Sequence, residues 1–130
     1  MRLLLDTHVV LWWLAGSPKL GGAARRLIGG ADCAVSTASL VELRTKVARG
    51  KLRLPGIPEF VALLDAEGFQ VLAVTPAHVE SGTRFELSVA DAVDRLLLGT
   101  AEVEGRELLT RDAALLALAS EAKLRFVRAG

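Results

Sequence analysis

The sequence predicts an α/β fold in which a short parallel central sheet is covered by helices on both faces. Short apolar runs alternate with segments of helical periodicity, the pattern typical of such a sheet. The length of 130 residues fits one domain with one buried core. No internal repeat, low-complexity segment or linker divides the chain. We therefore expect residues 1–130 to form a single domain.

Five short apolar runs are the predicted strands of this sheet. Polar or turn-forming residues bound each run, as expected for strands that are covered on both faces. The runs are residues 2–5, 33–35, 69–74, 107–109 and 124–127.

Between these runs the apolar residues recur at helical spacing. Thr75-Pro76 places proline at a first helical position, and Gly29-Gly30 and Gly50 are stop signals. The segment 86–90 is predicted to be a loop. The predicted helices are 7–14, 19–28, one marked by Leu40, Leu43 and Val47, 55–64, one that opens at 75, 91–101 and 112–119.

The composition favours a soluble, cytoplasmic protein without a membrane partner. No apolar stretch approaches the ~18 residues that cross a bilayer, and no secretory signal is evident. The only cysteine is Cys33, so we expect a reducing compartment and no disulfide. With a net charge of +1, nucleic-acid binding would depend on local charge. Such charge is found in one run without acids, which contains Arg44, Lys46, Arg49, Lys51 and Arg53.

Four acidic residues lie against apolar runs: Asp6, Glu42, Asp94 and Asp112. Asp6 and Asp112 follow predicted strands, whose carboxyl ends form the binding edge of an open α/β sheet. Asp94 and Glu42 lie on helices that can face the same edge. Two carboxylates about 4 Å apart repel by roughly 4 kcal/mol at an effective dielectric of 20, so the cluster requires a cation. Oxygen ligands without zinc-like Cys or His spacing predict Mg²⁺ or Mn²⁺, and hence a phosphate-ester substrate.

Each acid also has a structural explanation. The two acids that follow strands could cap the next helices, each contributing about 1 kcal/mol. Ser39 and Glu42 match the capping-box pattern, and Asp91 with Asp94 fits an N-cap and third-position pair. Capping explains each acid separately. It does not explain why four of them lie on elements that converge.

Four motifs in this order resemble the PIN-domain ribonucleases, and most closely the VapC-type toxins of bacterial and archaeal toxin-antitoxin pairs. The resemblance extends over residues 2–127. In the third motif the histidine and Pro-Phe that often precede the last aspartate in relatives are absent. The motifs are Leu4-Leu5-Asp6-Thr7-His8, Ser39-Leu40-Val41-Glu42-Leu43, Asp91-Ala92-Val93-Asp94-Arg95-Leu96-Leu97 and Leu109-Thr110-Arg111-Asp112.

The resemblance implies a PIN-like fold and a Mg²⁺-dependent endoribonuclease, the toxin of a pair controlled by a cognate antitoxin. Asp6, Asp94 and Asp112 would hold the metal, and Glu42 would orient a water or bind a second ion. Hydrolysis of the RNA phosphodiester would leave 5′-phosphate and 3′-hydroxyl ends. Related toxins form homodimers. The departure in the third motif leaves the role of Asp91 open.

Other side chains near the acids are candidates for contact with carboxylates or substrate. His8 is interpreted as a packing residue, with contact to substrate or a carboxylate as the alternative, and His78 as inert on a surface helix. One of Trp12 and Trp13 is expected in the core and the other nearer the surface, where it would suggest a protein interface; the alternative is that both pack internally. The further candidates are Thr7, Thr110, Arg95, Arg111, Lys46 and Arg49.

Two other classes of function stay open. The first is a non-toxin enzyme, such as an RNA-processing nuclease or an aspartate-based phosphatase. The phosphatase is disfavoured because His8 stands where a second aspartate would be needed. The second is a catalytically silent domain whose acids are caps and whose helices bind a partner.

Overall fold

Strand and helix alternate along the chain, and all strands join one sheet. The structure, a computed structural model, describes residues 1–116, 118 and 124–126. In chain order the elements are β1 (Arg2–Leu5), α1 (Thr7–Ala15), α2 (Gly22–Gly30), β2 (Asp32–Ser36), α3 (Thr37–Ala48), α4 (Ile57–Ala66), β3 (Gln70–Leu72), α5 (Pro76–Gly82), the 3-10 turn η1 (Thr83–Phe85), α6 (Ala92–Val103), β4 (Glu107–Thr110), α7 (Ala113–Leu116) and β5 (Leu124–Phe126).

The sheet is parallel throughout and has the strand order β3-β2-β1-β4-β5. Strand β1 is central: Leu4 pairs with Ala34 of β2 on one side and with Leu108 of β4 on the other. Leu3, Leu4 and Leu5 are fully buried, which explains why β1 is a continuous apolar run. The predicted parallel α/β fold is confirmed.

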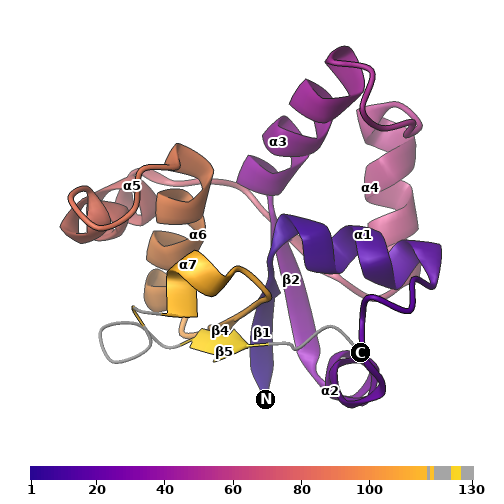
Figure 1. Ribbon diagram of the computed structural model, residues 1–130, viewed down its shortest axis with the longest axis horizontal. Coiled ribbons are helices and arrows are strands. Elements are labelled where there is room, and N and C mark those ends of the chain that lie inside the picture. Colours follow the sequence, from indigo (N-terminus) through magenta and orange to yellow (C-terminus); the bar gives the residue numbers. More distant parts are fainter. Residues whose placement is uncertain (117, 119–123, 127–130) are drawn as a thin grey trace.

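Helices cover both faces of the sheet. Leu3 and Leu5 belong to a core that includes residues of α1, α2, α3 and α4. Leu4 points the other way, into a second core with Phe85 and Leu97 of the α5–α6 side. Figure 1 shows α1, α3 and α4 on one side of the sheet and α5 and α6 on the other. The alternation of leucines along β1 therefore organises two layers.

A buried arginine joins the amino ends of three strands. Arg106, just before β4, is 2% exposed. Its guanidinium donates to the carbonyl oxygens of Leu3 (3.2 Å) and Asp32 (2.9 Å), to the Asp32 carboxylate (3.1 Å) and to the side chain of Gln70 (3.4 Å). Through these bonds one cation connects β1, β2 and β3 at the end of the sheet opposite the predicted site.

Several predicted boundaries differ from the structure. Helix α2 begins at Gly22 rather than at residue 19, because residues 17–20 form a turn in which the Leu20 amide donates to the Ser17 carbonyl (3.2 Å). It also continues through Gly29 and Gly30, since both keep helical geometry. Strand β3 is shorter than predicted, and the loop at 86–90 is confirmed. Parts of the predicted helix 112–119 and strand 124–127 lie outside the described residues.

The proposed capping box of Ser39 and Glu42 is wrong. The N-cap of α3 is Ser36, whose hydroxyl accepts a hydrogen bond from the Ala38 amide at 3.0 Å. Ser39 and Glu42 therefore lie inside the helix. Their side chains are available for other contacts.

The interpretation of His78 as an inert surface residue is also wrong. His78 is 1% exposed and forms a capping box with Thr75 at the start of α5. Its Nδ1 accepts from the Thr75 amide (3.1 Å), so its Nε2–H donates to Glu104 (2.9 Å) at the end of α6. The imidazole thus joins two helices.

Both tryptophans pack at the margin of the core and neither is fully buried. Trp13 lies against Phe69, with ring centroids 6.0 Å apart, and donates to Glu67 at 3.1 Å. Neither ring is exposed, so the structure is closer to the alternative in which both pack internally than to one buried and one exposed ring. Within the described residues no helix is long and apolar enough to span a membrane.

Candidate active site

Asp6 lies where β1 ends and α1 begins, and it is 7% exposed. Its carboxylate accepts hydrogen bonds from the Thr7 amide (2.7 Å) and the Thr110 hydroxyl (2.6 Å). The predicted N-cap is therefore present. Burial raises the pKa of Asp6 above its ordinary value, although the bonds from Thr110 and Thr7 act in the opposite direction. Capping alone leaves this charge incompletely compensated.

Asp94 lies in the first turn of α6 and is half-buried. Its amide donates to the Asp91 carboxylate at 2.9 Å, which confirms Asp91 as the N-cap. Burial, followed by the negative charges of Asp6, Asp91, Asp112 and Glu42, raises the pKa of Asp94 to about 7. The structure therefore brings every predicted acid within electrostatic range of Asp94.

A hydroxyl positions the remaining acid, Glu42. Thr7 Oγ1 lies 2.8 Å from Glu42 Oε1 and 2.9 Å from Ser39 Oγ, and both hydroxyl-bearing residues are fully buried. A carboxylate can only accept, so the single proton of Thr7 goes to Glu42 and the Ser39 hydroxyl donates to Thr7. This chain joins α1 to α3 and orients the Glu42 carboxylate.

Thr110 connects the two acids that end neighbouring strands. Its hydroxyl donates to Asp6, and it accepts from the Asp112 amide at 3.0 Å. The exposed Asp112 carboxylate in turn accepts from the Ala114 amide at 2.8 Å, in the manner of a cap. The predicted contacts of Thr7 and Thr110 with carboxylates are thus confirmed, and their contact with substrate stays a prediction.

A cavity of about 250 Å³ opens beside these acids, lined by Asp6, His8, Trp12, Arg111 and Asp112. His8 is exposed, and its Nε2 accepts from Lys46 Nζ at 2.9 Å. The Arg111 guanidinium lies over the Trp12 ring, 4.9 Å from its centroid. The interpretation of His8 as a packing residue is wrong, since its side chain lines the cavity. His8 and Trp12 are four residues apart on α1, a spacing that places both side chains on the same helix face and indicates that they line the same cavity.

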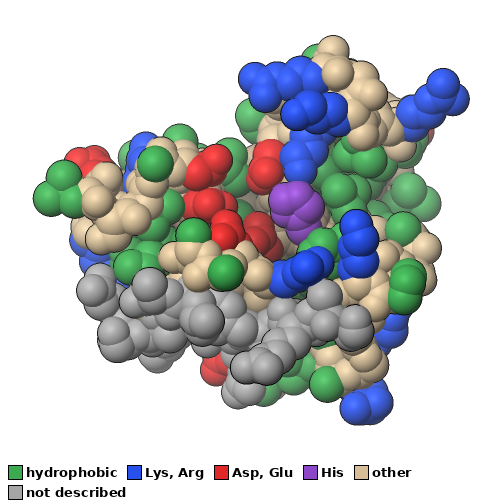
Figure 2. Space-filling model, in the orientation of Figure 1, with side chains coloured by type: hydrophobic (Ala, Val, Ile, Leu, Met, Phe, Trp, Pro, Cys, Tyr) green, Lys and Arg blue, Asp and Glu red, His purple; other side chains and the backbone are tan. Residues whose placement is uncertain are grey.

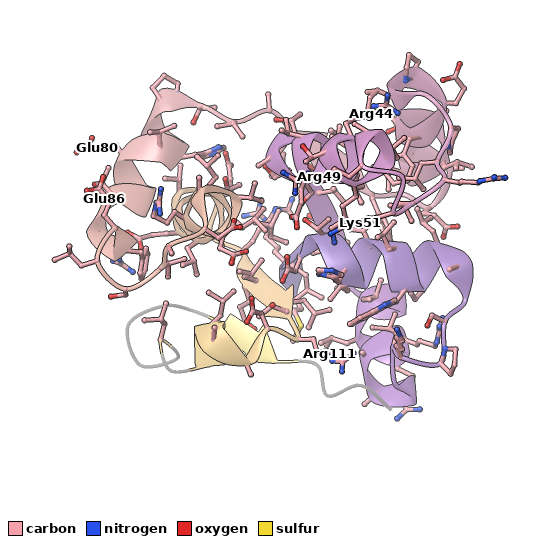
Figure 3. All side chains as sticks on the ribbon, turned by 45° about the horizontal axis from the view of Figure 1, so that its top comes forward. Arg44, Arg49, Lys51, Glu80, Glu86 and Arg111 are labelled. Atoms are coloured by element: carbon pink, nitrogen blue, oxygen red, sulfur yellow. The ribbon has the colours of Figure 1, made fainter. Side chains whose placement is uncertain are left out.

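Basic side chains lie next to the acidic site. Figure 2 shows acidic side chains in a hollow between the α5–α6 part of the molecule and α3, with basic side chains along α3. In Figure 3, Arg49 and Lys51 lie on the α3 side of this opening and Arg111 on the β4 side, whereas Glu80 and Glu86 lie at α5. A polyanion that approached the acids would pass these cations.

Arg95, a candidate for contact with carboxylates or substrate, binds backbone carbonyl oxygens in the structure. Its guanidinium donates to the carbonyl oxygens of Val89 (2.7 Å) and Ala90 (2.8 Å). These bonds hold the loop that leads into Asp91 and Asp94. Contact of Arg95, Lys46 or Arg49 with substrate stays a prediction.

The donor set fits a hard divalent cation. All the converging ligands are carboxylate oxygens, which Mg²⁺ and Mn²⁺ prefer, and Mg²⁺ usually keeps several waters while using one or two carboxylates. No three His, Cys, Asp or Glu side chains in the described part of the chain already stand at metal-ligand spacing.

Comparison with known proteins agrees with this geometry. Residues 3–121 match the PIN domain. The chain belongs to the PIN-domain family. This PIN domain is 34% identical over 113 residues to Ribonuclease VapC22 of Mycobacterium tuberculosis, a match that covers 85% of this chain and 86% of that protein.

Solved structures share the fold. The PIN domain resembles VapBC2 from Rickettsia felis, crystallised with a DNA fragment from its promoter, with a TM-score of 0.64, 16% identity and complete coverage of both chains. It also resembles VapBC-5 of Mycobacterium tuberculosis, a member of the VapBC toxin-antitoxin systems, with a TM-score of 0.62, 20% identity and 98% of each chain covered. The predicted family resemblance is confirmed.

Proposed function

We propose that this PIN domain is a Mg²⁺-dependent endoribonuclease that acts as the toxin of a toxin-antitoxin pair, with Mn²⁺ as an alternative metal. The observation that carries the proposal is the position of Asp94, which is half-buried and under the negative field of four other carboxylates. Asp6, Asp91 and Asp112 each accept a capping bond, but the Asp94 amide is itself the donor to Asp91. Capping therefore does not account for Asp94, whereas a cation does.

Each residue of the site has a separate role in the proposed reaction. Asp6, Asp94 and Asp112 would hold the cation. When bound, Mg²⁺ offsets the charge that develops on the phosphate and on the leaving oxygen. Thr7 engages Oε1 of Glu42, which presents the Glu42 carboxylate to a water that attacks phosphorus in line. The Thr110 hydroxyl bonds to both the Asp6 carboxylate and the Asp112 amide, and so fixes the position of one acid relative to the other.

The proposed partner is an antitoxin segment. The relative from Rickettsia felis is a VapBC protein, which supports such a partner. An apolar groove of about 490 Å³ lies between α1, the segment that links α3 to α4, and α4. Its wall includes Leu11, Leu54 and Leu63, and it shares Trp12 with the acidic cavity. A segment seated there could extend a basic side chain to the carboxylates. A homodimer, carried over from related toxins, completes the proposal.

Cleavage of RNA in cells and in vitro tests the proposal. Expression of the chain alone should arrest growth and produce discrete cuts in cellular RNA, and Asp6→Asn should abolish both. Glu86→Gln, which changes an exposed acid directly after η1, is the control with full activity. Purified protein should lose cleavage in a chelator and regain it with Mg²⁺. Cuts that persist in Asp6→Asn would contradict the proposal.

The non-toxin alternative uses the same site and differs in its biological effect. An RNA-processing nuclease would cut a defined RNA without arresting growth. The growth assay therefore separates it from a toxin. A catalytically silent domain would show neither cleavage nor metal-dependent stabilisation.

A further inference from the structure

Trp12 forms a wall of the acidic cavity, and nothing in the proposed chemistry uses it. The ring projects from α1 one helical turn after His8, whose ring centroid is 5.9 Å away. On the cavity side the exposed Arg111 guanidinium lies over the indole. Asp6 and Asp112 line the same cavity. A flat aromatic surface therefore lines the same cavity as two of the carboxylates that would hold the cation.

The contact between Arg111 and Trp12 is of a kind that a ligand can replace. A cation over an aromatic face at an exposed site is a weak interaction, because water solvates the cation almost as well. Stacking of a nucleic-acid base on an aromatic ring is stronger and tolerates every base. The displaced guanidinium would then be free to bind a phosphate oxygen, for which its planar donors are suited.

We propose that Trp12 is the stacking platform for the base next to the scissile phosphate, and that Arg111 moves from the ring to that phosphate when the base arrives. The inference rests on the proposed ribonuclease function and narrows its substrate class. A base can lie flat on Trp12 only when it is unpaired and unstacked from its neighbours, so the substrate is single-stranded or looped RNA. The cavity, at about 250 Å³, is smaller than those of drug-sized ligands and suits one nucleotide.

Trp13 provides a matched control on the same helix. Its ring packs against Phe69 and its Nε1–H donates to Glu67, and the described lining of the acidic cavity does not include it. The chain has two tryptophans and no tyrosine. Trp13→Phe therefore leaves Trp12 as the single indole fluorophore of the protein.

The first test is fluorescence of Trp13→Phe combined with Asp94→Asn, which should bind RNA without cutting it. Single-stranded octamers of adenosine and of uridine are titrated in the presence of Mg²⁺. Both should quench Trp12, adenosine more strongly because its base stacks better. Inorganic polyphosphate, which carries the charge without bases, should quench Trp12 less than either RNA does. Absence of quenching by RNA, or equal quenching by polyphosphate, would overturn the inference.

The second test is cleavage of single-stranded RNA by otherwise intact variants. Trp12→Ala should cut five- to a hundredfold more slowly than Trp13→Phe, the loss expected for one stacked base. Trp12→Phe should recover most of the rate, because phenyl rings also stack. An active protein in which Trp12→Ala equals Trp13→Phe would overturn the stacking role and leave the nuclease intact. Selective quenching by RNA in a protein that never cuts it would support stacking and contradict the nuclease.

Discussion

The Thr110 hydroxyl donates to the Asp6 carboxylate across 2.6 Å, a bond between the ends of two neighbouring parallel strands. Its removal by Thr110→Val should raise the pKa of Asp6 further, because this bond acts to lower it. Loss of a buried partner should also reduce the free energy of unfolding by about 1–3 kcal/mol. NMR titration of the Asp6 carboxyl and urea denaturation measure the two effects.

Thr100→Val is the control for this prediction. Thr100 is also fully buried, but its hydroxyl donates to the Leu96 carbonyl within α6. It should lower stability without changing the titration of Asp6. Equal titration curves for Thr110→Val and the wild type would show that the bond does not influence the acid.

The half-buried Asp94 should make metal-free stability depend on pH near neutrality. Its folded pKa of about 7 lies above the ordinary value of 3.8, so the folded state binds more protons between these values. Stability from this group is therefore full below about pH 4 and is lost as pH rises through 7. Asp94→Asn should remove that loss and raise stability at about pH 8 by on the order of 1–2 kcal/mol, a value discounted for solvent screening.

Thermal denaturation in a chelator across this pH range measures the effect. Asp65→Asn, which alters an exposed acid of α4, should retain the pH dependence of the wild type. If Asp94→Asn shows the same decline as the wild type, burial and the neighbouring carboxylates do not disfavour the ionised Asp94 as the structure indicates.

Arg106 should contribute to the stability of the fold rather than to RNA cleavage. Arg106→Met removes the bonds that join the amino ends of β1, β2 and β3, and should lower the free energy of unfolding by about 3 kcal/mol. Arg2→Met, at an exposed 3.8 Å ion pair with Asp32, should cost less than 1 kcal/mol by the same assay, about the usual limit for such pairs. A loss for Arg106→Met as small as that for Arg2→Met would contradict the proposed role of the buried cation.

The cations beside the opening should contribute to RNA binding through charge alone. Arg49→Ala should weaken binding equally for different sequences and reduce the slope of log affinity against log salt by about one. Arg26→Ala, on α2, should leave the slope unchanged. Fluorescence anisotropy with labelled single-stranded RNA provides both slopes. An unchanged slope for Arg49→Ala would remove this residue from the path of the substrate.

The strands and the acids were predictable because their signals are local. Asp6 follows an apolar run that can only be a buried strand, and strand ends define the binding edge. Contact of Thr7 with a carboxylate was predictable, but Glu42 as its partner was not, because that contact depends on where α3 begins. With Ser36 rather than Ser39 as the N-cap, Glu42 lies inside the helix and turns toward Thr7.

Residues that act through tertiary contacts were not predictable for the same reason. The sequence pattern places His78 on a surface, yet it is buried and donates a hydrogen bond to Glu104 at the end of α6. The position of Trp12 could not be separated from that of Trp13 by helical spacing, because Arg111 approaches from β4, a segment remote in sequence. Local patterns predict which side chains carry chemistry, whereas packing decides which of them meet.

The central claim is that the converging acids form a metal centre. Isothermal titration calorimetry tests it most directly: Mg²⁺ and Mn²⁺ are titrated into the metal-free wild type, Asp94→Asn and Asp65→Asn. We predict saturable heat for the wild type and for Asp65→Asn, stronger at about pH 8 than at about pH 6 because Asp94 must lose its proton. Asp94→Asn should show no such heat while remaining folded. Equal binding by folded Asp94→Asn and wild type, or no binding by either, would contradict the assignment of the converging acids to a metal centre.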